Sequence, residues 1–290
     1  NNFKLPYPLM NIINGGANAN NGLRIQEFMI RPDRAKSFSE AMQICFLVIK
    51  NLSKIIKSRG LSTSVGDEGG FAPMINNNNQ ALDLLKTIMN VQINLVIDWM
   101  RIGFIHGVMN TDNVSICGET IDYGPCAFMD IYNPETVFSS IDQQGRYSFS
   151  NQPKVIKWNL ARFAECIITL IDDNKDKAIE VATETINSFE KIYEEKWLNM
   201  MRDKLGLFGE DINDKILIME LLTWMHKNKV DYTNTFCFLM NEKFSDNEVY
   251  NDKNFIVWKE KWESRLKLNN NSPEKYLKLM HSVNPIIIPR

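Results

Sequence analysis

The residues best suited to chemistry lie between His106 and Pro125, where the sequence reads HGVMNTDNVSICGETIDYGP. Asp112 and Asn113 stand together on one turn-prone stretch, and Asp122 follows ten residues later on a second. Two carboxylates and an amide on neighbouring turns are the layout of a site for magnesium and a nucleotide. The alternative is that Thr-Asp-Asn and Asp-Tyr-Gly only form turns, since Asn, Asp and Gly favour them.

The sequence motifs around these residues point to one family. The chain carries, in order, HGVMNTDN (106–113), TIDYGP (120–125), DQQGRYSFSNQP (142–153) and WNLAR (158–162). It continues with KWLNMMRDKLGL (196–207), KVDYTNTF (229–236) and VNP (283–285). Together these motifs resemble selenoprotein O, a family of kinase-like proteins that transfer AMP from ATP onto protein hydroxyl groups. The resemblance covers about two-thirds of the chain.

This resemblance implies roles for the residues named above. Asp112 would be the general base, Asn113 and Asp122 would hold Mg²⁺, and all three would contact bound ATP. The partner would be a protein substrate that presents a Ser, Thr or Tyr hydroxyl. His106 is expected to be a structural hydrogen-bonding residue. In the family, a small lobe that supplies a Gly-rich loop, a Lys and a Glu lies upstream of the shared region, so we expect impaired transfer by this chain alone.

A second resemblance occupies residues 5–90. Several motifs in this stretch are similar to those of enolase: LPYPLMNIINGGANA, IQEFMI, AKSFSEA, KSRGL and VGDEGGFAP. That likeness implies that Glu27 and Glu68 are an acidic pair directed at the departing hydroxyl of 2-phosphoglycerate. Asn18 stands where enolases usually carry His. The site would also be incomplete, because the base Lys and the magnesium carboxylates of enolase come from later strands of a barrel that needs eight strands to close.

The two resemblances meet between Met89 and Asn94, with no Gly/Ser-rich or Pro-rich linker. We therefore expect an enolase-like barrel fragment over 1–92 and a partial selenoprotein O-like, kinase-fold large lobe over 93–290. The expected fold class is α+β and mostly α, with an incomplete α/β segment ahead of the helical lobe. So abrupt a join suggests a gene fusion or an artefactual chimera, and the sequence does not choose between them.

Hydrophobic periodicity and capping signals predict the main elements. A helix over 37–59 has a capping-box pattern at Ser37 and Glu40 and a stop at Gly60. IQEFMI and LSTSVGD are predicted to be strands of a β/α unit with the two glutamates at their C-terminal ends. Further helices are predicted over 157–171, 177–205 and 214–227, with a last one opening at 272–274. Residues 245–254 and 269–272 are predicted to be loops.

Composition is that of an ordinary globular protein: 290 residues, 44% hydrophobic and 23% charged, with a net charge of −2. That charge argues against nucleic acid or an anionic membrane as a partner, and no apolar run approaches a membrane span. An odd set of five cysteines without a CxxC pair fits reduced thiols and a cytoplasmic location. The first residue is Asn and no signal peptide is evident, which suggests a truncated sequence. The oligomeric state is left open.

Three functions therefore remain open at this stage. The first is Mg-ATP-dependent transfer of AMP to protein hydroxyls, weakened in this chain. The second is an enolase-like phosphopyruvate hydratase fragment. The third is a non-catalytic fusion that responds to neither ligand.

Overall fold

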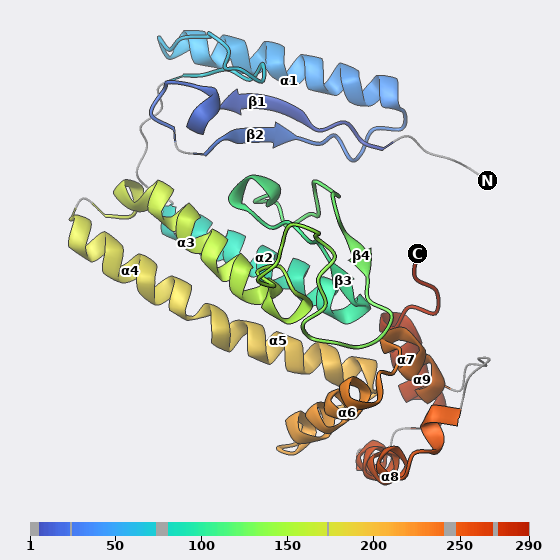
Figure 1. The fold of residues 1–290 in the computed structure, drawn as a ribbon. Coiled ribbons are helices and arrows are strands. Elements are labelled where there is room, and N and C mark those ends of the chain that lie inside the picture. Colours follow the sequence, from blue (N-terminus) through green and yellow to red (C-terminus); the bar gives the residue numbers. More distant parts are fainter. Residues whose placement is uncertain are drawn as a thin grey trace. The chain divides into compact units, whose positions relative to one another are not determined.

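The computed structural model describes residues 6–23, 25–73, 81–172, 174–240, 248–268 and 272–289. The chain divides into two compact units. One comprises Asn1–Leu82 with Phe163–Ile179, and the other comprises Asp83–Arg162 with Glu180–Arg290. The described part is mostly helical, with two short two-stranded sheets, so the expected α+β, mostly α class is confirmed (Figure 1).

In the first unit, β1 (Met10–Asn14) pairs antiparallel with β2 (Glu27–Ile30), with an irregularity between Asn11 and Ile13. This corrects the expected β/α arrangement, because Glu27 opens β2 instead of closing it. Residues 61–67 form no strand apart from an isolated bridge at Val65, so Glu68 does not follow one. The pairing of β2 with β1 depends on residues outside IQEFMI, so the local pattern of this segment does not predict its direction.

Helix α1 (Phe38–Ser58) follows the predicted signals closely. The Ser37 hydroxyl accepts a hydrogen bond from the Glu40 amide, and the Glu40 carboxylate accepts one from the Lys36 amide. The chain leaves the helix through Gly60, whose φ of +70° costs glycine little because it has no Cβ. Capping at both ends thus explains why this helix could be predicted almost to the residue.

The second unit begins within α2 (Ala81–Ile102), which runs unbroken through residue 92, where the two sequence resemblances meet. A short antiparallel pair follows, β3 (Phe104–Ile105) with β4 (Ala127–Phe128). Helix α3 (Gln152–Ile171) starts five residues earlier than predicted and ends where predicted. The domain boundary expected at residue 92 was based on where the two sequence resemblances meet. It stays a prediction.

One long helix predicted over 177–205 is instead two, α4 (Lys175–Asn187) and α5 (Phe189–Lys204). At the break, the Ser188 hydroxyl donates to the Thr185 carbonyl at 2.7 Å, and the Thr185 hydroxyl donates to the Val181 carbonyl at 2.9 Å. Hydroxyls that bond to carbonyls of the preceding turn compete with the helix and bend it. The apolar stripe continues across the break, which is why periodicity alone did not reveal it.

The remaining helices are α6 (Asp214–Asn228), α7 (Tyr232–Leu239), α8 (Lys253–Lys267) and α9 (Pro273–Val283). The predictions for α6 and α9 are confirmed, whereas α7 and α8 were not predicted. The predicted loop over 245–254 is partly wrong, since residues 248–251 form a 3-10 helix and Lys253 opens α8, while 245–247 lie outside the described residues. Of the loop predicted over 269–272, only Ser272, which precedes α9, is described.

Indole groups tie these helices together. The Trp258 indole donates to the Leu217 carbonyl, and the Trp262 indole donates to the Leu205 carbonyl, each at 2.8 Å. Both rings are buried. All five cysteines are free thiols, as predicted. No helix in the described ranges is long and apolar enough to cross a bilayer.

Candidate active site

The second unit brings the two predicted metal ligands together. Asn113 ends a short 3-10 helix, Thr111–Asn113, and its side-chain amide donates to the Asp122 carboxylate at 3.3 Å. Asp122 has a φ of +52°, a left-handed conformation that Asp adopts more readily than most residues. Its carbonyl accepts a hydrogen bond from the Gly124 amide at 2.7 Å, which closes the turn. The two turns therefore face each other, as the sequence spacing suggested.

The candidate groups also have the exposure that a ligand site requires. Asp112 and Asp122 are exposed, and Asn113 is half-buried. Mg²⁺ is held in proteins by oxygen ligands, commonly one or two carboxylates plus substrate phosphates. Across the described ranges no cluster of three or more His, Cys, Asp or Glu side chains could hold a metal ion. A set of two carboxylates and one amide therefore fits a metal that arrives with a nucleotide better than a closed protein cage.

A buried amide side chain fixes the start of the segment that carries Asp112. Gln152, the first residue of α3, is fully buried. Its oxygen accepts from the His106 amide and its nitrogen donates to the Phe104 carbonyl, both at 3.0 Å. One side chain thus satisfies two backbone groups, as a neighbouring strand would, and holds the chain where it leaves β3.

Two further side chains hold the next four residues. The Asn159 side-chain amide, about two turns further along the same face of α3, donates to the Met109 carbonyl at 3.0 Å. The Tyr147 hydroxyl donates to the Asn110 side chain at 2.5 Å. Together with the Gln152 bonds, these contacts anchor the backbone up to the residue that precedes the 3-10 helix of Asp112.

A buried histidine connects the two acidic turns. The His106 ring is buried, and its Nε2 lies 2.7 Å from the Ile121 carbonyl oxygen. The neighbouring Trp99 indole donates to the Thr120 hydroxyl at 2.9 Å. Both residues that precede Asp122 are therefore fixed by side chains from the first half of the unit. The prediction that His106 is a structural hydrogen-bonding residue is confirmed.

Two glycines permit this close packing. Gly107 has a φ of +82°, and a Cβ there would lie 2.9 Å from the Pro125 ring. Gly118 has a φ of +72°, and a Cβ there would lie 2.0 Å from a methyl carbon of Val91. Neither position accepts a side chain without movement of the backbone. Gly107 of the HGV motif and Pro125 of the YGP motif therefore pack closely against each other.

The enolase-like glutamates occupy the first unit. Glu27 accepts a hydrogen bond from the Asn11 side chain at 3.2 Å, and Glu68 is exposed in the loop between Gly66 and Gly70. That loop is held by Asn14, whose side-chain oxygen accepts from the Gly70 amide at 2.7 Å. The role of the two glutamates as an acidic pair stays a prediction.

Comparison with known proteins assigns the family. Residues 37–290 match the family described as protein adenylyltransferase SelO. The chain therefore belongs to the SelO family. It is 64% identical over 212 residues to a protein nucleotidyltransferase YdiU of Pelagibacter ubique, and 54% identical over 212 residues to the one of Alcanivorax borkumensis. A third, from Nitrosococcus oceani, is 50% identical over 220 residues.

These matches cover 73–76% of the chain but only 44–45% of each relative, so the chain spans less than half the length of the proteins it resembles. The family match begins at residue 37, inside the segment for which an enolase-like origin was expected. The comparisons support membership in the SelO family over most of the chain and give no support to an enolase portion or a chimera.

Sequence reasoning missed the side chains that anchor the site. The motifs SNQP, WNLAR and GRYSF supported the family resemblance, but no role was predicted for their residues Gln152, Asn159 and Tyr147. A signal was present, because Gln152 and Asn159 are polar residues seven positions apart on the buried face of a helix. Polar groups on a buried face require partners, and here those partners are backbone groups of the candidate catalytic segment.

Proposed function

We propose that this chain carries the metal and catalytic residues of an ATP-dependent protein adenylyltransferase within a kinase-like lobe. The observation that supports this most directly is the contact of Asn113 with Asp122, on turns anchored by buried side chains. Phosphoryl and nucleotidyl transfer depend on positioning and charge neutralisation. An exposed carboxylate and a half-buried amide in contact, beside the second exposed carboxylate of Asp112, are suited to both.

In the proposed reaction, the substrate is a protein that presents a Ser, Thr or Tyr hydroxyl. Asp112 accepts the hydroxyl proton as the oxygen forms a bond to the α-phosphorus of ATP. The bond from that phosphorus to its bridging oxygen breaks, and pyrophosphate leaves. Asn113 and Asp122 would hold a magnesium ion, which would supply positive charge against the phosphates.

The test is the thermal unfolding of the chain with Mg-ATP, with ATP and a chelator, and without ligand. Ligand that binds only the folded state raises the unfolding temperature by mass action. We expect Mg-ATP to stabilise the wild type, Asp122→Ala to abolish the effect, and Asp112→Ala to retain it. Asp83→Ala, which removes an exposed carboxylate in the first turn of α2, is the matched control. Stabilisation that survives in Asp122→Ala would refute the assignment.

A further inference from the structure

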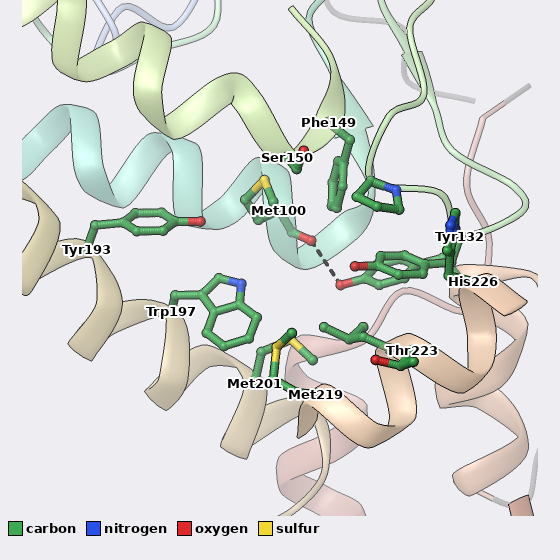
Figure 2. Close-up of a pocket in the computed structure, with 13 residues that line it drawn as sticks. Met100, Tyr132, Phe149, Ser150, Tyr193, Trp197, Met201, Met219, Thr223 and His226 are labelled. Carbon is green, nitrogen blue, oxygen red and sulfur yellow. Dashed lines mark hydrogen bonds between the residues drawn. The ribbon is translucent and has the colours of Figure 1, made fainter. Parts of the chain in front are cut away.

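A cavity of about 390 Å³ lies in the second unit, and none of the residues assigned to the nucleotide lines it (Figure 2). Five aromatic rings line it, together with methionine, leucine and proline side chains: Tyr132, Phe149, Tyr193, Trp197 and Tyr232. Its volume falls in the range of sites that bind small molecules. Such walls favour a flat, apolar partner, because aromatic rings stack or meet edge to face.

The described part of the wall carries no acidic side chain, lysine or arginine to pair with an ion. None of the described residues that line the cavity is Asp, Glu, Lys or Arg. His226 is exposed at its edge. A phosphate or carboxylate would enter without a cation to balance it, and burial of an unpaired charge is costly. The chemistry of the wall therefore selects an uncharged ligand.

The polar groups of the wall differ in whether they have a hydrogen-bond partner among the described residues. The Tyr232 hydroxyl donates to the Met100 carbonyl at 3.0 Å, as the dashed line in Figure 2 shows. In contrast, the Tyr193 hydroxyl and the Trp197 indole nitrogen point into the open space of the cavity, and neither makes a hydrogen bond within the described residues. Other indoles of this unit, including those of Trp258 and Trp262, do donate to the protein.

The tyrosine hydroxyls are available as donors. Burial raises the pKa of Tyr132 to about 12, and it raises the pKa of Tyr193 further above the ordinary value. Both hydroxyls therefore keep their hydrogens at neutral pH. A ligand that carries a hydroxyl or carbonyl oxygen would accept from Tyr193 or Trp197 in this otherwise apolar space.

We propose that this cavity is a binding site for an uncharged, planar aromatic molecule with a hydroxyl or carbonyl oxygen, separate from the nucleotide site. A ligand there would touch Phe149 and Ser150. These residues lie between Tyr147 and Gln152, which anchor the segment before Asp112. The site is thus placed where its ligand contacts the support of the candidate catalytic segment.

The first test locates binding by methionine-methyl NMR of the whole chain, with β-naphthol as the probe. Of the 14 methionines in the sequence, the cavity is lined by Met100, Met201 and Met219. We expect saturable shifts of these three methyl signals. Absence of saturable shifts at these three positions would overturn the proposal. This measurement needs no variant and so does not depend on whether a substitution folds.

The second test blocks the cavity. Thr223 is exposed on α6 and lines it, so Thr223→Trp fills the space from the surface. The control Ile216→Trp places the same ring on the exposed face of the same helix, outside the wall. We expect β-naphthol to bind about tenfold more weakly to Thr223→Trp and equally to Ile216→Trp. Equal affinity in both variants would overturn the proposal.

The third test is chemical. β-Naphthoate has the same rings with a charged carboxylate, and decahydro-β-naphthol keeps the hydroxyl without the aromatic faces. We expect each to bind about tenfold more weakly than β-naphthol, since the wall offers stacking and donors but no cation. Tighter binding of either analogue would show that the ligand class is wrong.

Discussion

The His106 ring nitrogen Nε2 lies 2.7 Å from the carbonyl oxygen of Ile121, the residue before Asp122. Because a carbonyl only accepts, Nε2 carries the hydrogen of this bond. The ring is buried against Trp99, with centroids 5.4 Å apart, so it cannot turn to water for another partner. One side chain therefore sets the distance between the beginning of the Asp112 segment and the Asp122 turn.

Substitution of His106 should show what this bond contributes. His106→Phe keeps an aromatic ring beside Trp99 and leaves the Ile121 carbonyl without its donor. We expect a loss of about 1–3 kcal/mol in the free energy of unfolding, the cost of a buried unsatisfied group. We also expect a smaller Mg-ATP shift, because Asp122 loses its support. His226→Phe, at an exposed position, is the control for urea unfolding. A His106→Phe protein as stable as the wild type would contradict the inference.

Gln152 gives a second prediction. Gln152→Leu is similar in size but leaves the His106 amide and the Phe104 carbonyl unpaired. Since each buried group costs about 1–3 kcal/mol, we expect a total loss of about 2–6 kcal/mol. Hydrogen exchange of the His106 amide should accelerate beyond the global change. Gln143→Leu, which alters an exposed glutamine, should leave both quantities unchanged. Unaltered His106 exchange relative to other core amides would argue against the anchoring role.

How much of this arrangement the sequence could predict depends on how local each feature is. A few neighbouring residues encode the N-cap of α1 at Ser37 and the start of α9 at Ser272–Pro273. Both were predicted. Asn113 and Asp122 are only nine positions apart, and the family resemblance assigned both to one metal site, so their proximity was expected. These features share a short sequence separation.

Features set by distant partners could not be predicted in the same way. The pairing of β1 with β2 depends on a return of the chain after Asn14, and IQEFMI alone does not specify its direction. The contacts of Gln152 reach back across 46 and 48 residues to the start of the catalytic segment. Periodicity marks which face of α3 is buried, but it does not identify the backbone that a buried amide meets.

A buried ion cluster should govern the behaviour of the helical core in acid. The Asp214 carboxylate lies 2.7 Å from Nε of Arg202 and 2.7 Å from Nε of Arg265, and all three side chains are buried. Burial alone would raise the pKa of Asp214, but the hydrogen bonds from Arg265 and Arg202 outweigh it and leave the pKa below its ordinary value. The cluster joins α5, α6 and α8.

Asp214→Asn should therefore be strongly destabilising. It removes the negative charge that Arg265 contacts and leaves Arg202 only the exposed Glu210 carboxylate, 3.5 Å away, so we expect a loss of about 3–5 kcal/mol near neutral pH. Because the folded pKa is depressed, the contribution of Asp214 is present above its unfolded pKa and is lost as pH falls through the folded pKa. Urea unfolding from neutral pH to below pH 3.8 should show this loss in the wild type and not in Asp214→Asn. Asp98→Asn, in an exposed pair with Arg101, should change stability by less than about 1 kcal/mol.

Lys204 should produce the opposite dependence at alkaline pH. Its ammonium nitrogen donates to the Arg101 carbonyl at 2.7 Å and lies 3.8 Å from the centre of the Phe236 ring, with the whole side chain buried. Burial, with the nearby charge of Arg101, lowers the pKa of Lys204 well below 10.5. The unfolded chain then binds a proton more readily than the folded chain at pH values between the folded pKa and 10.5.

The sign of the effect follows from that difference. Where the unfolded state holds more protons, the free energy of unfolding rises with pH, by at most about 1.4 kcal/mol per pH unit for one group. We expect this rise in the wild type as pH approaches 10.5, and its loss in Lys204→Met, which removes the titrating amine but keeps an unbranched side chain. Near neutral pH two effects oppose each other in this variant: the Arg101 carbonyl loses its donor, and the desolvation cost of a buried amine is removed. Lys215→Met, which breaks an exposed pair with Glu194, is the control and should retain the alkaline rise. If the free energy of unfolding still rises with pH in Lys204→Met, another group causes the alkaline dependence and its assignment to Lys204 is wrong.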